Sequence, residues 1–140
     1  MSKIFFISSI LFLCGVICSQ DESLSNKLKN KQFKVTKFSS EYISKLKEKL
    51  NAGIPILKFN EDNLELSGVC NSCNFKILYY SGSSINISNS KCTKMHCGEI
   101  LILENFIIDL LENAKMIFYE GGKLVINSSN EKEISAESIF

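Results

Sequence analysis

The chain has 140 residues, 45% of them hydrophobic, and a formal net charge of +1. All of its basic residues apart from one histidine are lysines, because the sequence contains no arginine. Without guanidinium groups for phosphates or base edges, and without aromatic residues interleaved among the lysines, the composition argues against a nucleic-acid-binding protein. The length allows one small domain with a modest core.

The first 19 residues have the pattern of a secretory signal peptide. Lys3 supplies a positive charge, Ile4–Cys18 is an apolar run, and residues 20–22 turn sharply polar. The run is too short to span a bilayer well. We therefore expect cleavage after Cys18 or Ser19, and a protein that is secreted or held in the lumen of the secretory pathway, with no stable membrane insertion after cleavage.

Four cysteines would remain in the mature protein: Cys70, Cys73, Cys92 and Cys97. An even number in a short secreted chain predicts two disulfides, each contributing about 2–4 kcal/mol, and the residues alone leave three pairings open. The same cysteines with His96 could instead bind zinc, and the C-x-x-C spacing could be a redox dithiol. An oxidising compartment favours disulfides, so we expect no cofactor.

Residues 20–53 form a lysine-rich N-terminal arm. Between positions 21 and 50 the sequence has eight lysines and four acidic residues. We expect a weak strand at Phe33–Phe38 and a short helix at Glu41–Leu50, capped by Ser39 or Ser40. The remainder, 54–140, forms the main domain, which begins with two short strands at Ile56–Phe59 and Leu64–Val69.

A hairpin with a defined register follows. Phe75, Ile77 and Tyr79 occupy every second position of one run, and Ile85 and Ile87 do the same in the next. A five-residue linker places Tyr79 opposite Ile85 and Ile77 opposite Ile87, with all five apolar side chains on one face, whereas a four-residue linker would put Asn86 opposite Tyr79. Cys73 then points inward on the same face.

The period changes after the last cysteine. Leu103–Ala114 has apolar residues at helical spacing, and Glu104 falls among the polar residues that mark its solvent face. A second hairpin follows, in which Gly121-Gly122 forms a two-residue turn and Glu120 lies opposite Lys123. We therefore predict an α+β fold: a curved antiparallel sheet, or a cracked small β-barrel, with one amphipathic helix packed on it.

Two sequons, at Asn86 (N-I-S) and Asn127 (N-S-S), predict glycosylation in a secreted protein. His96 is the only histidine, and no Ser-His-Asp or Cys-His arrangement can be built around it from the sequence. We therefore expect a protein that is not an enzyme.

The order of these motifs resembles the META domain family, also called HslJ-like, over Phe59–Ile126. The family pattern is a strand ending in glycine, a Cys-Asn pair, a hairpin, a T-x-M-x-C element, an amphipathic helix and a further hairpin. The matching motif residues here are Gly68, Cys73, Asn74, Thr93, Met95 and Cys97.

The resemblance implies a small β-rich domain around one helix, and it brings no catalytic residues. Members include bacterial envelope lipoproteins and proteins linked to secretion and virulence in protozoan parasites. The two commonest cysteine positions of the family imply a Cys73–Cys97 disulfide, which leaves Cys70 with Cys92. Met95 would then pack in the core beside the disulfides.

Three classes of function are compatible with the sequence. We favour a secreted, non-enzymatic META-domain protein that binds an unknown protein or a small apolar ligand and acts in secretion, the cell envelope or virulence. An exposed apolar patch, or an apolar cavity inside the sheet, would support this class. The alternatives are a secreted inhibitor or effector with a protruding stapled loop, at Ser81–Ser84 or Ser90–Met95, and a small thiol or zinc enzyme.

Overall fold

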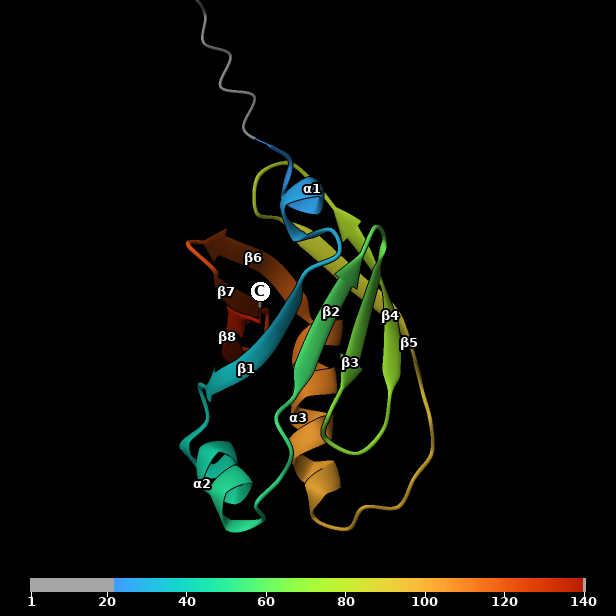
Figure 1. Ribbon diagram of the computed structural model, residues 1–140, viewed down its shortest axis with the longest axis vertical. Helices are drawn as coiled ribbons and strands as arrows, with labels where there is room; N and C mark the ends of the chain where they lie inside the picture. Colours follow the sequence, from blue (N-terminus) through green and yellow to red (C-terminus); the bar gives the residue numbers. More distant parts are fainter. Residues whose placement is uncertain (1–21, 140) are drawn as a thin grey trace, which may run out of the picture.

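The computed structural model describes residues 22–139, in which eight strands and three helices form one α+β unit (Figure 1). The elements are α1 (Leu24–Leu28), β1 (Gln32–Phe38), α2 (Glu41–Lys49), β2 (Ile56–Asn60), β3 (Asn63–Ser67), β4 (Cys73–Tyr79), β5 (Ile85–Cys92), α3 (Ile100–Glu112), β6 (Ala114–Glu120), β7 (Lys123–Ser128) and β8 (Glu133–Ser138). The strands form a single antiparallel sheet in the order β5-β4-β3-β2-β1-β8-β7-β6. This confirms the predicted fold class.

The sheet is nearly closed into a barrel, because its two edge strands, β5 and β6, meet over a short stretch. Ser84 and Met116 form an isolated bridge, and the N–H of Ile117 donates to the Ser83 carbonyl at 3.0 Å. Elsewhere the edges separate, and α3 packs against both β5 and β7 to cover the gap. We call the line where β5 approaches β6 the seam.

Side-chain alternation fills the interior of the curved sheet. The inward residues of β4 are Cys73, Phe75 and Ile77, and each is fully buried. The predicted register of the first hairpin is confirmed, with Tyr79 opposite Ile85 and Ile77 opposite Ile87. In this register Phe75, Ile77, Ile85 and Ile87 point into the core, whereas Leu78 points to the outer face.

The second hairpin is also confirmed. Glu120 pairs with Lys123 across a two-residue turn in which Gly121 and Gly122 have positive φ. Such turns require left-handed backbone at both central positions, which glycine adopts without steric cost.

The strand and the short helix predicted in the N-terminal segment are present, as β1 and α2. The strand β1 lies in the middle of the sheet, between β2 and β8. Before it, α1 begins at Leu24 and buries Leu28 completely. Ser40 caps α2 by accepting the N–H of Ile43 at 3.3 Å, whereas Ser39 accepts the N–H of Glu133. The lysine-rich segment is therefore continuous with the fold.

The helix predicted at Leu103–Ala114 is present, but it begins and ends a few residues earlier than predicted. α3 spans Ile100–Glu112, and Ala114 begins β6. The helix ends at Asn113, whose N–H returns to carbonyls of the last turn. The predicted signal peptide, residues 1–19, lies outside the described residues, and within 22–139 no helix has the length and apolar character needed to cross a membrane.

Candidate functional site

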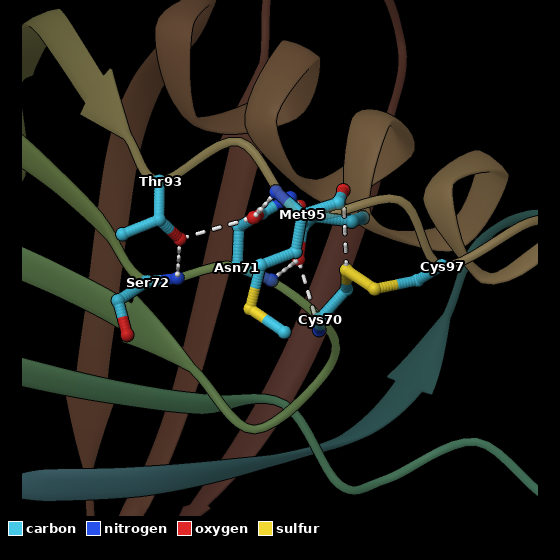
Figure 2. Close-up of a disulfide and its surroundings, with 7 residues drawn as sticks. Cys70, Asn71, Ser72, Thr93, Met95 and Cys97 are labelled. Carbon is cyan, nitrogen blue, oxygen red and sulfur yellow. Dashed lines mark hydrogen bonds between the residues drawn. A yellow bond between two sulfur atoms is a disulfide. The ribbon is translucent and has the colours of Figure 1, made fainter.

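Two disulfides lie at one end of the molecule, near the start of α3, one between two loops and one between β4 and β5. Cys70 is bonded to Cys97, and Cys73 to Cys92. The predicted pairing of Cys73 with Cys97 and of Cys70 with Cys92 was therefore wrong, although all four cysteines are paired as expected. The strand register explains the difference, because Cys73 and Cys92 are directly opposite on β4 and β5, with Cα atoms 4.1 Å apart. Cys70 lies outside β4 and bonds to the loop that leads into α3 (Figure 2).

A buried carboxylate holds the same loops together. Glu104 of α3 is only 1% exposed, so its predicted place on the solvent face was wrong. Its Oε2 accepts the main-chain N–H groups of Cys70 at 3.0 Å and Asn71 at 2.7 Å, and its Oε1 accepts from the side-chain amide of Asn71 at 2.7 Å. These three donors satisfy a charge that would otherwise be costly to bury.

Asn71 extends this network to the loop after β5. Its Oδ1 accepts the Met95 N–H at 2.7 Å and the Thr93 hydroxyl at 3.0 Å (Figure 2). Thr93 in turn accepts the Ser72 N–H at 3.1 Å. One carboxylate and one amide thus tie α3 to two loops, and we call Asn71, Thr93 and Glu104 the polar anchor.

Most of the family-motif residues have structural roles in the backbone turns, the disulfides and the polar anchor. Gly68 has φ +89°, and a Cβ there would lie 2.3 Å from the Ile54 carbonyl oxygen, so only glycine fits. Thr93 is part of the polar anchor, whereas Asn74 is exposed on the outer face of β4. Met95 is 60% exposed, which contradicts its predicted place in the core. Its main chain, rather than its thioether, makes the buried contact.

The other chemical candidates do not converge on a reactive centre. All four sulfur atoms are in disulfides, which leaves no thiolate from these cysteines for zinc or for dithiol chemistry. His96 is exposed, and within residues 22–139 it makes no hydrogen bond or ion pair. Of the two loops considered for an inhibitor, Ser81–Ser84 is a tight turn closed by the Tyr80 N–H, and Ser90–Met95 is half strand and half anchored loop.

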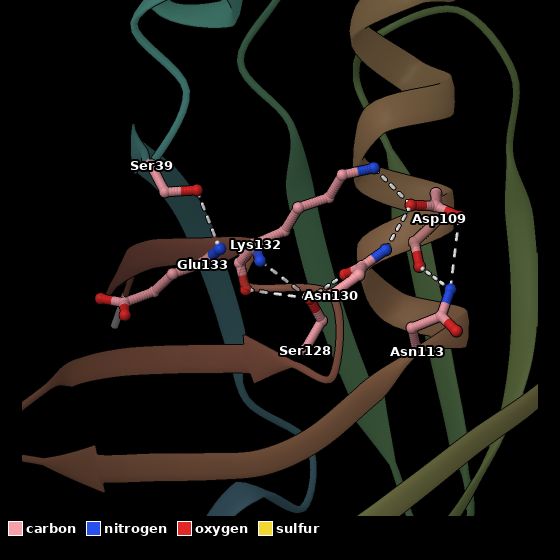
Figure 3. Close-up of polar contacts among 7 residues, drawn as sticks. All are labelled: Ser39, Asp109, Asn113, Ser128, Asn130, Lys132 and Glu133. Atoms are coloured by element: carbon pink, nitrogen blue, oxygen red, sulfur yellow. Dashed lines mark hydrogen bonds and ion pairs between the residues drawn. The ribbon is translucent and has the colours of Figure 1, made fainter.

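A second polar cluster fastens the β7–β8 turn to α3 (Figure 3). Lys132 forms an ion pair with Asp109 and lies 5.1 Å above the ring of Phe106. Asn130 donates to the same carboxylate at 2.9 Å. The hydrogen bond from Lys132 is the main reason that the pKa of Asp109 is below its usual value. Since these groups are partly exposed and mutually satisfied, the cluster is structural.

The two sequon asparagines lie in different surroundings. Asn86 is exposed on the outer face of β5, opposite Leu78. Asn127 is half-buried, and its Oδ1 is shielded from solvent without a hydrogen-bond partner. Of the two, the Asn86 position leaves more room for a glycan, and the glycosylation of both stays a prediction.

An exposed apolar patch lies along the seam, at the end of the molecule away from the two disulfides. Its members point outward from β4 and β6 and from the turn after β4: Leu78 (54% exposed), Tyr80 (59%), Met116 (37%) and Phe118 (44%). Strand pairing places Tyr80 and Met116 on either side of Ser84, since Ser84 bridges to Met116 and Tyr80 donates its N–H to the Ser84 carbonyl. Leu78 precedes Tyr80 and Phe118 follows Met116 by two residues along their own segments. We call these four residues the seam patch. Sequence reasoning missed the patch, because the strands that create it are far apart in the chain.

Comparisons with known proteins agree with this fold. A family model of the META domain matches residues 26–138, which confirms the resemblance and extends it well beyond Phe59–Ile126. A search of curated proteins found no match. Two solved structures are similar in fold. One is a crystal structure of a DUF4847 family protein from Bacteroides vulgatus, with a TM-score of 0.62 and 12% identity, covering 82% of this chain and 96% of that one.

The other is an NMR structure of a protein from Burkholderia xenovorans, with a TM-score of 0.60 and 9% identity, covering 81% of this chain and 85% of that one. At such identities the two structures support the fold alone. The family model covers most of the chain, from α1 to β8, and includes both disulfides and the polar anchor. The chain therefore belongs to the META domain family.

Proposed function

We propose that this protein is a secreted, non-enzymatic binding module that holds a partner protein at the seam patch. The seam patch carries the proposal, because four large apolar side chains are exposed together on an outer sheet surface. Contiguous exposed apolar surface is uncommon on small soluble proteins and is typical of interaction sites. Tyrosine and phenylalanine are also enriched in protein–protein interfaces.

The filled interior of the sheet supports a protein partner over a small apolar ligand. Phe33, Phe59 and Phe75 occupy the centre of the curved sheet and are almost fully buried, and Leu103 and Ile107 of α3 pack on the same core. An apolar ligand held inside the sheet would have to displace these side chains. The apolar surface that is available lies outside, on the seam patch.

The disulfides support the secretory route, since such bonds persist in oxidising compartments. The test is the intact mass of the protein recovered from the medium of cells that express the full chain, before and after alkylation under non-reducing conditions. We expect the mass of a chain that begins after residue 18 or 19, with two disulfides and no free thiol. Retention inside the cell with four alkylatable thiols would contradict the secreted state.

Binding is tested by crosslinking the secreted protein to its surroundings and comparing matched variants. Tyr80→Ser and Phe118→Ser alter the seam patch, and Tyr42→Ser is the control, because Tyr42 is 62% exposed on α2 at the opposite end. We expect the wild type and the control to retain the same crosslinked partner and the patch variants to lose it. Equal capture by all four proteins would remove the seam patch from the function.

A further inference from the structure

An open cleft adjoins the seam patch and is lined in part by α1. Figure 1 shows α1 at one end of the molecule. The volume of the cleft is about 570 Å³. Tyr80, the turn 81–83 and Phe118 line one part of it, and Leu24 and Lys27 of α1 line another. A Cβ added to Gly82 would meet no atom within 4 Å, so the space over the turn is open. The cleft therefore has aromatic walls and an unobstructed mouth.

One side of the cleft is a sheet edge with free main-chain groups. The N–H of Ile117 points across the seam and is bonded to Ser83, the last such bond before β5 gives way to its turn. Strand alternation directs the N–H and C=O of Tyr119 to the same side, and in the described part of the chain neither has a partner there. An unpaired strand edge of this kind is a template for an added strand.

The charged side chains that line the cleft have no ion-pair partners among residues 22–139. They are Glu22, Glu120 and Lys27. The cleft lining has two carboxylates and one ammonium, Lys31 lies nearby on the Tyr119 hydroxyl, and Glu120 is left as a negative group at the sheet edge. A partner segment with a basic residue would complement it.

We propose that the cleft binds an extended segment of the partner protein, which adds as a short strand to the free edge of β6. The inference rests on the proposed function and specifies the form of the partner. Its main chain bonds to Tyr119, one apolar side chain packs between Tyr80 and Phe118, and a lysine or arginine faces Glu120. The segment takes the place beside β6 that β5 leaves when it turns at Ser83.

The experiment is a selection of random peptides displayed on phage against the folded protein with both disulfides intact, counter-selected on Phe118→Ser. Selected sequences are then made as synthetic peptides, and their affinities are measured by calorimetry. We expect apolar segments with a basic residue. Phe118→Ser should weaken them about thirtyfold, as is typical of truncating a central aromatic contact.

Further variants separate the parts of the proposal. Gly82→Asn keeps a residue that tolerates positive φ but places a side chain in the cleft, so it should also weaken binding. Glu120→Gln should weaken only peptides with a basic residue, whereas Tyr42→Ser should leave the affinity unchanged. Strand addition should protect the Tyr119 amide from hydrogen exchange and leave the already bonded Ile117 amide as it was. Circular dichroism verifies that each variant is folded.

Three results would overturn the inference. One is a selection that enriches no peptide over the counter-selection. Another is a bound peptide that leaves the exchange of the Tyr119 amide unchanged, because the segment would then bind without strand addition. The last is a concentration-dependent dimer that Phe118→Ser abolishes, since a second copy would then occupy the cleft. If a partner is still captured through the seam patch while no peptide binds, the proposed function stands and this inference fails.

Discussion

Replacing Glu104 by glutamine tests whether the polar anchor stabilises the fold. The two side chains have nearly the same size, so packing against α3 is preserved and the charge and one acceptor are lost. The glutamine oxygen can replace the carboxylate oxygen that accepts the Cys70 and Asn71 main-chain N–H groups. Its NH₂ group then faces the Asn71 side-chain NH₂, so two donors oppose each other where the wild type has a bond of 2.7 Å.

The hydrogen-bond geometry gives the size of the effect. Bonds to a charged acceptor are worth about 1.5–3 kcal/mol each, and neutral ones about 0.5–1.5 kcal/mol. Two bonds are therefore weakened and one is lost, but removing the buried charge also lowers the desolvation cost of folding. A flip of the Asn71 amide gives no relief, because its Oδ1 is already committed to Thr93 and Met95. We expect Glu104→Gln to lower the free energy of unfolding by about 2–4 kcal/mol.

The measurement is urea unfolding at pH 7 with both disulfides intact, followed by far-ultraviolet circular dichroism. With a urea m-value of about 2 kcal/mol/M, the midpoint should fall by about 1–2 M. The control is Glu99→Gln, an exposed position at the start of the same helix whose side chain makes no capping bond. It should change stability by about 0.5 kcal/mol or less. If Glu104→Gln behaves like this control, the anchor does not stabilise the protein and our reasoning about it is wrong.

Three further predictions concern backbone strain, acid stability and reduction. Gly82→Ala should lower the free energy of unfolding by about 1–2 kcal/mol, as for any alanine in left-handed backbone. Gly68→Ala should lower it clearly more, because its Cβ would also lie 2.3 Å from a main-chain carbonyl oxygen. Thermal unfolding compares the two variants, and equal losses of stability would contradict the steric argument. The folded-state pKa of Asp109 is lowered, so the contribution of its carboxylate to the free energy of unfolding is complete above its unfolded pKa of about 3.9 and is lost as pH falls through the folded value. The stabilities of wild type and Asp109→Asn should therefore converge in acid. A difference that persists at the lowest pH would refute this. Under mild reductant, mass mapping after alkylation should find the half-buried Cys70–Cys97 disulfide opened before the cross-strand disulfide that lies partly in the core, and the reverse order would show that burial does not control access.

Register and element type could be predicted from the sequence because local patterns determine them. Ile77 and Tyr79 share a face with Ile85 and Ile87, and a loop one residue shorter would turn Asn86 toward Tyr79, so burial favours the observed register over that neighbouring one. The two-residue turn at Gly121 and Gly122 is also determined by the residues that form it. These elements need no knowledge of what lies across the sheet.

The disulfide pairing and the buried carboxylate depend on non-local geometry. The predicted pairing came from family positions, whereas the register that aligns Cys73 with Cys92 includes a bulge after Asn74 that alternation does not reveal. Glu104 has the helical position of a core residue and the chemistry of a surface residue. Its burial is possible only because a loop 33 residues away presents N–H groups to it. A sequence pattern that counts apolar residues necessarily assigns such a glutamate to solvent.

The two ends of the molecule therefore have different roles, and this separation makes the binding proposal testable. The disulfides and the polar anchor constrain the end at the start of α3, where substitutions should change stability. At the other end Tyr80 and Phe118 are substantially exposed, so replacing them removes little buried surface and should cost little stability. A loss of binding in those variants can then be attributed to lost contacts at the cleft, whereas the same loss in a Glu104 variant would reflect unfolding. Only the first kind of variant can locate the site.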